Sequence, residues 1–393
     1  MISKDLKKSK TKEKERFLFN PFEMAFCGYS NSGKTTLINR LIKKLSEHCT
    51  VGYLKHDVHH FDMDREGKDT WLAWQSGASQ VLISDSLSGA KLQRGSPNRF
   101  EQKSALINTD VVLIEGYKNE DLTKVVMIDQ ERRILEKVES GEMSSIIAFV
   151  GQEECIDGLP VNIPYFQRDK IDDIYKFVVG YWQSRVPPLY GLVLTGGKST
   201  RMKRDKALLT YSDSPEKLTQ AESLYELLRP LTKKTFLSSR QGQWPEVFDH
   251  LPQIHDQFLE MGPLSGILSA QRAYPEAAWL VVACDLPFLT EDTLKRLLAH
   301  RDSRKFATCF NSAINGLPEP LCAIYEPKSY QKSIEFLAQG VECPRKILLN
   351  TSVYRVELDN SVALENINYA EEFEQAKIIL QKNMGKNHVV QRN

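Results

Sequence analysis

Short apolar runs separated by amphipathic stretches recur along the whole chain. Runs of about four to eight apolar residues are typical of buried strands, and apolar positions about every three to four residues are typical of helices. The strand candidates lie at residues 22–29, 50–55, 80–84, 110–116, 124–129, 145–150, 190–194, 234–239, 252–256, 279–288 and 319–325. Since strands that alternate with helices form a parallel sheet, the pattern predicts an α/β fold of doubly wound domains.

Two consecutive prolines divide the pattern into halves. A helix is predicted at residues 171–182, and Pro187 and Pro188 follow it, where they favour an extended spacer. Further helices are predicted at residues 36–46, 71–78 and 222–228, and another begins within 261–267. The expected organisation is a disordered basic tail at 1–20, a first domain at 21–184, a proline linker at 185–189, a second domain at 190–383 and a tail at 384–393.

The composition narrows the classes of protein that fit. Of the 393 residues, 41% are hydrophobic and 26% are charged, as in globular domains, and the formal net charge is +1. No run is long enough to span a membrane, and the lysine-rich start lacks the apolar stretch of a secretory signal. The seven cysteines are widely spaced and without a C-x-x-C pair, which argues against a disulfide framework and a zinc site. We expect a cytoplasmic protein that binds neither nucleic acid nor membrane.

The segment G-Y-S-N-S-G-K-T at residues 28–35 fits the phosphate-loop pattern G-x-x-x-x-G-K-[ST]. A strand before it and an apolar helix stripe after it supply the context that this motif requires. Lys34 would reach the β- and γ-phosphates, and the Thr35 hydroxyl would bind Mg²⁺, while backbone N–H groups hold the anion. The first domain is thus predicted to be P-loop NTPase-like, with nucleotide contacts at Gly28, Ser30, Asn31, Ser32, Gly33, Lys34, Thr35 and Thr36.

Acidic residues in the first half are candidates for the magnesium side of this site. Glu115 ends an apolar run, as does the carboxylate near Mg²⁺ or its waters in nucleotide-binding sheets. The segment from His56 to Asp64 holds three histidines and three aspartates, which fit a metal site and a solvated active-site loop equally well. We favour a role of Asp62 or Asp64 in magnesium or phosphate chemistry, because loops at the carboxyl edge of a parallel sheet bind ligands. The expected magnesium ligands of this half are Thr35, Asp62 and Glu115.

Residues 22 to about 180 resemble the MobB family of molybdopterin-guanine dinucleotide biosynthesis adapter proteins. The segments that carry the resemblance are GYSNSGKTTL, LKHDVHHFDMDREGKDTW, SGA and VVLIEGYK. The resemblance implies a weak GTP-binding protein, often a homodimer, that assists a guanylyltransferase and meets apo-molybdoenzymes and a molybdenum insertion protein. Because no Asn-Lys-x-Asp element occurs, guanine in this half follows from the resemblance and not from the residues.

A second loop suited to phosphate follows the linker. The apolar run at 191–194 leads into Thr195, the pair Gly196 and Gly197, and a basic segment with Arg201 and Lys206. Paired glycines let backbone N–H groups approach phosphate oxygens, and the two cations can neutralise a triphosphate. The alternative is an ordinary strand, a glycine turn and solvated basic residues.

Two acids end strand candidates in the second half. Asp285 follows a strongly apolar run and precedes Pro287, which stops further strand pairing. An acid buried there needs a partner, and Mg²⁺ bridging nucleotide phosphates is the natural one. Asp256 stands before the glycine-containing turn that starts the helix within 261–267. From the residues alone, Asp256 either contacts a nucleotide or merely ends a strand and caps a turn.

The run GGKSTRM followed by DKALL resembles the signature loop of the MobA family of molybdenum cofactor guanylyltransferases, and the resemblance spans about residues 190–383. It implies a nucleotide-diphospho-sugar-transferase-like, Rossmann-type domain that transfers GMP from GTP to Mo-molybdopterin and releases pyrophosphate. It also implies Mg²⁺ on Asp285, with Arg201 and Lys206 stabilising the triphosphate. The implied GTP contacts are Leu194, Thr195, Gly196, Gly197, Lys206, Asp256 and Asp285. Two departures, Thr195 for the usual Ala and Lys203 for a common Gly, alter the loop itself.

Two later segments are candidates for the pterin side of the second site. Arg345 and Lys346 either meet the anionic pterin phosphate or are ordinary surface cations. The turn from Asn366 to Asn368 matches the closing motif of the same family, in which it caps the last helix with or without a contact to the pterin.

Three functions fit these residues. We expect a molybdenum cofactor guanylyltransferase fused to a GTP-binding adapter, with Mg²⁺ as its cofactor and GTP and Mo-molybdopterin as its ligands. A cytidylyltransferase for the same cofactor would keep the fold and change the base. A nucleotide-switched adapter that delivers the cofactor, with weak transferase activity, belongs to a different class and rests on the phosphate loop alone.

Overall fold

The computed structural model describes residues 18–56, 64–196, 205–211, 218–244, 247–258 and 260–390. The chain divides into two compact units, Met1–Arg185 and Val186–Asn393, which we call unit 1 and unit 2 and treat one at a time. Among the helices of the described residues, none combines the length and the apolar character needed to cross a lipid bilayer.

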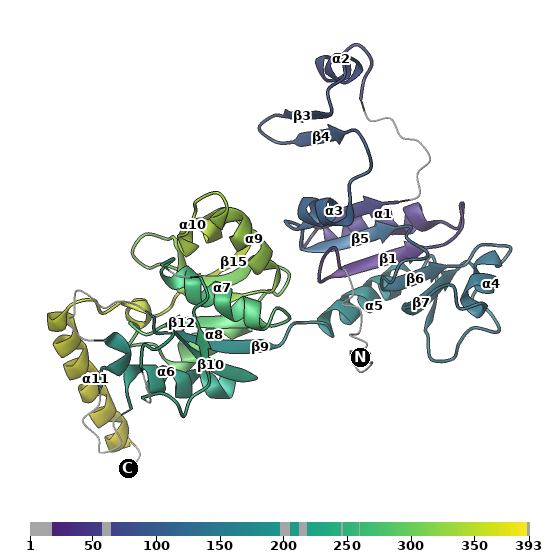
Figure 1. Cartoon of the computed structure of the whole chain (residues 1–393). Helices are drawn as coiled ribbons and strands as arrows, with labels where there is room; N and C mark the ends of the chain where they lie inside the picture. Colours follow the sequence, from purple (N-terminus) through teal and green to yellow (C-terminus); the bar gives the residue numbers. More distant parts are fainter. Residues whose placement is uncertain are drawn as a thin grey trace, which may run out of the picture. The chain divides into compact units, whose positions relative to one another are not determined.

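A six-stranded sheet forms the centre of unit 1 (Figure 1). Its order is β2-β5-β1-β6-β7-β8, and every neighbouring pair is parallel, so all the carboxyl ends lie at one edge of the sheet. At three residues, the last strand is too short to show in the apolar pattern. The strands are β1 Glu23–Cys27, β2 Val51–Lys55, β5 Val111–Glu115, β6 Lys124–Met127, β7 Ile146–Gly151 and β8 Tyr165–Gln167.

Both faces of this sheet bury apolar side chains, because successive residues of a strand point to opposite faces. On one face, Met24 and Phe26 belong to a core with residues of α1 and α5. On the other face, Ala25 and Cys27 belong to a core with residues of α3 and α4. The doubly wound α/β arrangement predicted for this half is therefore confirmed. The helices are α1 Lys34–Leu45, α3 Arg99–Leu106, α4 Arg133–Glu139 and α5 Ile171–Gln183.

The first described residues are part of this fold. Phe19 and Asn20 are each 2% exposed, and their backbone N–H groups donate to the Glu23 carboxylate at 2.7 and 3.1 Å. Trp182 of α5 donates from Nε1 to the Glu23 carbonyl at 3.1 Å, which ties the last helix of the unit to its central strand. Phe19 and Asn20, which the sequence assigned to the tail at 1–20, thus pack with the domain.

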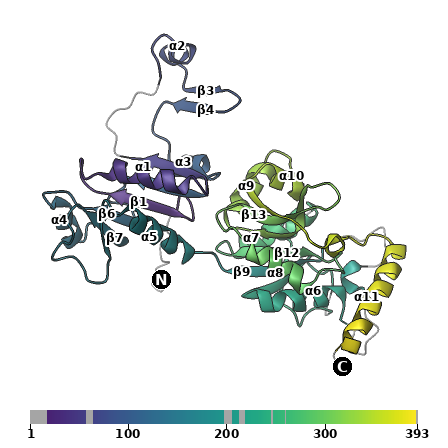
Figure 2. The same ribbon diagram turned by 180° about the vertical axis from the view of Figure 1, so that it is seen from behind.

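The predicted strand at residues 80–84 does not join the parallel sheet, which corrects the sequence analysis. It forms β3 Gln80–Ser84, which pairs antiparallel with β4 Gly89–Gln93 in a separate two-stranded hairpin. The hairpin contacts the short helix α2 Asp69–Gln75, and both lie apart from the six-stranded sheet (Figures 1 and 2).

Local chemistry explains the hairpin. The Asp85 carboxylate accepts from the backbone N–H groups of Leu87 and Ser88 at 2.7 and 2.6 Å, which closes a tight turn. A turn this short allows only antiparallel pairing, since parallel strands need a long crossover. The hairpin leaves large apolar side chains in solvent, with Leu82 exposed by 76%, Ile83 by 55% and Leu87 by 95%.

A seven-stranded mixed sheet forms the centre of unit 2, in the order β11-β10-β9-β12-β14-β13-β15. The first four strands in this order are parallel to one another, as a Rossmann-type domain requires. β14 runs antiparallel to both β12 and β13, a feature that the apolar pattern does not reveal. The strands are β9 Leu189–Leu194, β10 Lys234–Ser239, β11 Gln253–His255, β12 Ala278–Ala283, β13 Ala307–Asn311, β14 Pro318–Tyr325 and β15 Val353–Val356.

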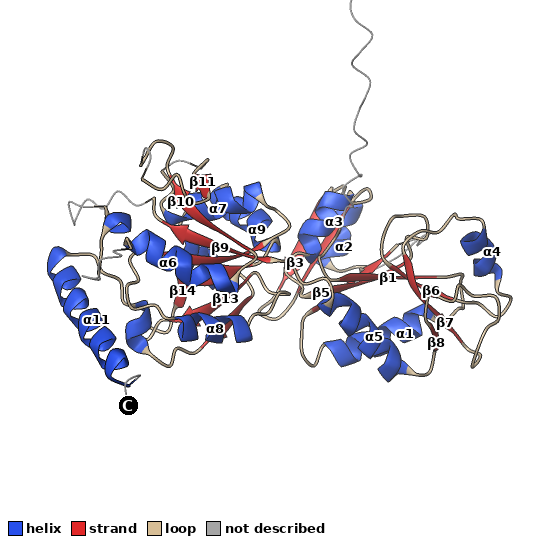
Figure 3. Cartoon of the chain, turned by 90° about the horizontal axis from the view of Figure 1, so that it is seen from below, coloured by secondary structure: helices blue, strands red, loops and turns tan. Residues whose placement is uncertain are grey.

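Helices cover both faces of this sheet as well (Figure 3). Residues of α6 and α8 pack on one face, and residues of α7 and α10 pack on the other. α7 comes so near the sheet at Gly266 that a Cβ atom there would lie 2.7 Å from Leu194 Cδ2. Residues 384–390, assigned to a tail, continue the last helix. The helices are α6 Gln220–Leu228, α7 Pro263–Ala273, α8 Glu291–Ala299, α9 Lys328–Leu337, α10 Pro344–Leu349 and α11 Ala370–Val390.

A buried ion pair holds the start of unit 2 against its sheet. The fully buried Glu326 carboxylate accepts from Arg301 Nε at 2.7 Å and from Arg301 Nη2 at 3.0 Å. The same Nη2 donates to the Pro187 carbonyl at 2.9 Å, just before β9. Burial raises the pKa of Glu326, and the Arg301 guanidinium opposes this rise.

We predict that Glu326→Ala lowers the free energy of unfolding of unit 2 by about 3–5 kcal/mol, because it leaves Arg301 buried without its partner. Hydrogen exchange of the β12 and β14 peptides over a denaturant series would measure the loss. The matched control is Asp359→Ala, which removes an exposed ion pair with Arg296 and should cost less than about 1 kcal/mol. Equal, small losses in the two variants would contradict the prediction.

Candidate functional site

The parallel strands of unit 2 bring the predicted site residues to one edge of the sheet. Since β11, β10, β9 and β12 run in the same direction, the residues that follow them meet at their carboxyl ends. Gly196 follows β9, Asp256 follows β11 and Asp285 follows β12. Asp256 lies close to Gly196, since a Cβ atom on Gly196 would be 3.1 Å from Asp256 Oδ2. We call this group, together with Lys206 and Asn368, the edge site.

Lys206 and Asp285 form the charged centre of the edge site. Lys206 begins the short 3₁₀ helix η1 Lys206–Leu208, and its Nζ lies 3.5 Å from Asp285 Oδ2. The Asp285 side chain is only 20% exposed, and burial raises its pKa, while Lys206 opposes the rise. Asp285 Oδ1 is buried and has no hydrogen-bond partner among the residues that the structure describes. A buried carboxylate oxygen without a donor is suited to a cation.

The turn before α11 reaches the edge site through Asn368. The Lys206 ammonium donates to Asn368 Oδ1 at 2.8 Å, and the Ile367 N–H donates to the Asp285 carbonyl at 3.0 Å. The sequence predicted that this Asn-x-Asn turn caps the last helix. Instead, the Glu372 carboxylate accepts from the N–H groups of Asn368 and Tyr369 at 2.7 and 3.1 Å. Because Glu372 serves the helix end, the Asn368 side chain is available to hold Lys206.

Three residues that the motif analysis gave no role hold the ends of the signature loop. The Asp205 carboxylate accepts from the Ala207 N–H at 3.0 Å, from Trp244 Nε1 at 2.9 Å and from Gln243 Nε2 at 3.2 Å. Gln243 Nε2 also donates to the Thr195 carbonyl at 3.1 Å. These bonds join the two described ends of the loop. Gln243 and Trp244 come shortly after the predicted strand 234–239. This position in the sequence is the signal that would have placed them at the carboxyl edge.

Leu194 and Thr195, at the start of the signature loop, make hydrogen bonds to the segments beside β9. The Leu194 carbonyl accepts from the Cys284 N–H at 3.1 Å, as a ladder bond does. The Thr195 N–H donates to the Ser238 carbonyl at 3.2 Å, and its hydroxyl donates to the same oxygen. Thr195 is therefore only 1% exposed, and the hydroxyl that departs from the usual Ala points into the protein. Gly197, Arg201 and Lys203 lie outside the described residues.

Asp256 follows β11 and lies between Ser238 and the loop at Gly196. Its Oδ1 accepts from Ser238 Oγ at 2.8 Å, and its Oδ2 faces Gly196 of the loop. Burial raises the pKa of Asp256, and the hydrogen bond from Ser238 opposes the rise. Asp256 is thus a partly buried acid that is oriented by Ser238 and faces Gly196, and a carboxylate can accept further hydrogen bonds.

In unit 1, the phosphate loop joins β1 to α1 as the motif requires. Gly28 admits no side chain, since a Cβ atom would lie 2.7 Å from the Met127 carbonyl oxygen, and Gly33 has a φ of 87°. Lys34 donates from Nζ to the Tyr29 carbonyl at 2.7 Å, and burial lowers its pKa. The side chains of Ser30, Asn31, Thr35 and Thr36 are exposed at the loop, whereas that of Ser32 is buried.

The predicted magnesium residues Thr35 and Glu115 meet in the structure. Thr35 Oγ1 lies 3.0 Å from each carboxylate oxygen of Glu115. Glu115 is 6% exposed, accepts from the Tyr53 hydroxyl at 2.7 Å and has Lys55 Nζ at 3.5 Å. Asp62 lies outside the described residues. Within the described part of the chain, no group of three or more His, Cys, Asp or Glu side chains is arranged to hold a metal ion.

Two other candidates have local roles. Asp64 Oδ1 accepts from the Arg65 N–H at 2.8 Å and from Thr70 Oγ1 at 2.9 Å, next to α2. Arg345 pairs with Glu319 at 3.0 Å and donates from Nε to the Pro318 carbonyl at 3.1 Å, which ties α10 to β14. These contacts account for Arg345 without a pterin phosphate.

Known proteins similar to this chain fall into the two families that its motifs indicated. Residues 24–152 match the family described as molybdopterin guanine dinucleotide synthesis protein B, MobB, and residues 191–353 match the MobA-like NTP transferase domain. A probable molybdenum cofactor guanylyltransferase of Trichormus variabilis is 32% identical over 200 residues, which cover 47% of this chain and 88% of that protein. The chain belongs to the family of molybdenum cofactor guanylyltransferases.

Two further relatives match only in part. A molybdenum cofactor biosynthesis bifunctional protein of Synechocystis sp. is 39% identical over 189 residues, which cover 48% of this chain and 53% of that protein. A molybdopterin-guanine dinucleotide biosynthesis adapter protein of Haemophilus influenzae is 36% identical over 113 residues, 28% of this chain and 64% of that protein. The chain thus spans about half of the length of the bifunctional relative. The two resemblances predicted from the motifs are confirmed, one in each half.

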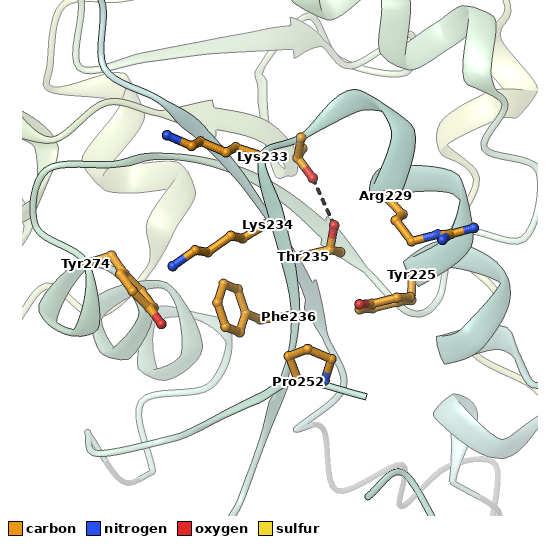
Figure 4. Close-up of a pocket in the computed structure, with 9 residues that line it drawn as sticks. Tyr225, Arg229, Lys233, Lys234, Thr235, Phe236, Pro252 and Tyr274 are labelled. Carbon is orange, nitrogen blue, oxygen red and sulfur yellow. Dashed lines mark hydrogen bonds between the residues drawn. The ribbon is translucent and has the colours of Figure 1, made fainter. Parts of the chain in front are cut away.

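A separate hollow of about 390 Å³ lies away from the edge site of this transferase domain (Figure 4). Lys233 and Lys234 line it together with Phe236 and Tyr274. Lys234 is the first residue of β10, so the hollow lies at the amino ends of the parallel strands, opposite the carboxyl ends that carry Asp256 and Asp285. It is therefore not part of the edge site.

We predict that Asp285→Asn raises the stability of unit 2 by about 1 kcal/mol at pH 8 without nucleotide or metal. Burial raises the pKa of Asp285, so folding at pH 8 buries a charge that the unfolded chain keeps in water. The free-energy cost of burying the Asp285 charge is absent below the ordinary carboxyl pKa of 3.8 and complete above the raised pKa of the folded state. The stability gained by Asp285→Asn therefore shrinks as the pH falls. Calorimetry at pH 8 and over a series of lower pH values measures it, and a destabilised Asn variant at pH 8 contradicts it.

Proposed function

We propose that unit 2 transfers GMP from GTP to Mo-molybdopterin at the edge site, and that unit 1 is a GTP-binding adapter for this reaction. The single observation that carries the proposal is the pair Lys206–Asp285 at the carboxyl edge, where Asp285 Oδ1 is buried without a hydrogen-bond partner in the described part of the chain. The names of the relatives support the same reaction.

The residues of the edge site fit a magnesium–nucleotide complex. Mg²⁺ is bound in such sites by one or two carboxylates together with substrate phosphates, and Asp285 supplies one carboxylate with a free oxygen. When bound, Mg²⁺ would neutralise charge that develops on the phosphates. In unit 1, Thr35 and Glu115 are the corresponding pair.

The chain supplies position and charge to the transfer. A phosphate oxygen of Mo-molybdopterin attacks the α-phosphorus of GTP, and the bond to the bridging oxygen breaks, so pyrophosphate leaves with the electron pair. Lys206, which Asn368 orients, and Arg201 would neutralise the triphosphate and the leaving group. The backbone from Leu194 to Gly197 would lie along the nucleoside.

Asp256 is the proposed guanine contact. Guanine carries N–H donors on one edge, and a carboxylate can accept from them. Ser238 orients the Asp256 carboxylate against the loop at Gly196, which supports this role. Cytosine also carries an amino donor, so a cytidylyltransferase with the same residues is the competing function.

We predict that Asp285→Ala lowers GTP-dependent transfer by at least about 10²-fold, since it removes the carboxylate that would hold the charge-neutralising Mg²⁺. Pyrophosphate release would be measured with GTP or CTP, with and without Mo-molybdopterin, and a chelator should abolish it. Asp292→Ala removes an exposed carboxylate on α8 and should leave the rate unchanged.

The outcomes separate the competing functions. Near-normal transfer by Asp285→Ala overturns the assignment of Asp285. A preference for CTP keeps the mechanism and changes the product. Phosphate release from GTP without any pyrophosphate makes the phosphate loop the working site and favours a nucleotide-switched adapter, which apo-molybdoenzymes or a molybdenum insertion protein would then bind.

We also propose that unit 1 forms a homodimer through the hairpin of β3 and β4. The exposed Leu82, Ile83 and Leu87 support this, because large apolar side chains gathered on one projecting element are typical of an interface. The hairpin is also short and carries two free strand edges.

We predict that the double variant Leu82→Glu/Leu87→Glu is monomeric at concentrations at which the unchanged chain is dimeric, because it sets charges in the apolar contact. Sedimentation velocity would measure the change. Val161→Glu, at a fully exposed position outside the hairpin, is the matched control and should remain dimeric. A monomeric unchanged chain, or a dimer that survives the double change, would overturn this interface.

A further inference from the structure

An arginine that follows the edge strand β8 lies against the phosphate loop of unit 1. Arg168 directly follows β8, and its backbone N–H donates to the carbonyl of Gly151, the last residue of β7, at 2.6 Å. Its side chain reaches Gly33, where a Cβ atom would lie 2.7 Å from Arg168 Nη1 and 3.0 Å from Cδ. The absence of a side chain at Gly33 therefore admits the guanidinium to the loop.

The three edges of this guanidinium have different surroundings. The edge with Cδ and Nη1 packs on Gly33. The end of the fork faces Gln152, whose amide oxygen accepts from Nη1 at 2.9 Å and from Nη2 at 3.0 Å in the orientation that satisfies both groups. Within the described residues, the remaining edge, with Nε and the outer N–H of Nη2, has no hydrogen-bond partner, and no carboxylate pairs with Arg168. A fixed two-donor fork is thus left open beside the loop.

The strand order tells which end of a nucleotide would meet this fork. Thr35 and Glu115, the proposed magnesium pair, lie on the β5 side of β1. Such a metal bridges the β- and γ-phosphates, so the end of the triphosphate belongs on that side. The nucleoside then extends over the opposite side, where β6, β7 and β8 end. Gln152 follows β7 and Arg168 follows β8, so both stand on the nucleoside side.

We infer that Arg168, held by Gln152, recognises the guanine base of the nucleotide bound in unit 1. Its open fork matches the acceptor pair O6 and N7 of guanine, which arginine commonly binds with two hydrogen bonds. Adenine places an amino donor where guanine has O6, and this donor would oppose the arginine. In this inference, Arg168 and Gln152 take the place of the Asn-Lys-x-Asp element, which does not occur in the sequence. The inference rests on the proposed nucleotide binding by unit 1.

The test needs a local readout, because the full chain has a second proposed GTP site in unit 2. Hydrogen exchange of peptides that cover residues 28–36 reports protection of the phosphate loop alone. The full chain would be titrated with GTP, ITP, ATP and inorganic tripolyphosphate, each with Mg²⁺. ITP keeps O6 and N7 of guanine, and tripolyphosphate has no base. We expect GTP and ITP to protect the loop at similar concentrations, and ATP to need about 5- to 150-fold more.

Arg168→Lys keeps the charge and removes the fork. It should raise the concentrations of GTP and ITP needed for protection to that of ATP, and leave ATP and tripolyphosphate unchanged. Gln152→Leu should give a smaller shift in the same direction, because the fork remains but is no longer oriented. Arg40→Met, which removes a cation from α1 that pairs with Asp169 at 3.4 Å, should change none of the four values. Unchanged protection by tripolyphosphate also shows that the loop of each variant is folded.

The outcomes separate this inference from the proposal beneath it. If Arg168→Lys weakens protection by all four ligands equally, Arg168 contacts phosphate or supports the loop, and the inference is overturned. If GTP and ATP protect the unchanged chain equally, base recognition by this pair is overturned as well. If no ligand protects the loop of the unchanged chain, the nucleotide binding of unit 1 fails and the inference fails with it.

Discussion

A carboxylate buried at the carboxyl end of a parallel strand is the constraint on which both units depend. Burying such a charge is costly unless partners surround it. Glu115 has three partners, the hydroxyls of Thr35 and Tyr53 and the ammonium of Lys55. Asp285 has Lys206 near one oxygen, and its other oxygen has no hydrogen-bond partner within the described residues. Glu115 and Asp285 thus occupy the same position in their two folds. They differ in how many of their carboxylate oxygens are bound by partners within the protein.

The edge site of unit 2 is formed by residues from distant parts of the chain. Asp205 is tied to Gln243 and Trp244, and Asn368 accepts from the Lys206 ammonium, so these bonds help to hold Lys206 beside Asp285. These residues come from four separate segments, and the Ile367 N–H bonds the Asp285 backbone directly. The last segment of the unit is therefore needed for the geometry of the first loop, which explains why its closing motif belongs with the transferase signature.

The sequence predicted the residues whose roles are local and missed those whose roles depend on pairing. The phosphate loop, the acids at strand ends and most of the strands follow from motifs and apolar runs. The hairpin of β3 and β4 looked like one more strand of the sheet, because a run of apolar residues does not encode its partner. Gln243 carries no motif, and its bonds to Thr195 and Asp205 arise only when β9 and β10 pair. The roles of the candidate site residues, Arg201 and Asp62 among them, and the domain limits remain predictions.

The difference in compensation bears on how strongly each unit can hold a nucleotide. In unit 1, a phosphate must take Lys34 from the Tyr29 carbonyl, and a metal must take Thr35 from Glu115. Each new contact replaces an existing one, so the net gain per contact is small. In unit 2, a cation at Asp285 would approach an oxygen that has no hydrogen-bond partner among the described residues, and it would offset the burial that raises the pKa of Asp285. For the two proposed nucleotide sites, these contacts predict tighter, metal-dependent binding at the edge site of unit 2 than at the phosphate loop of unit 1.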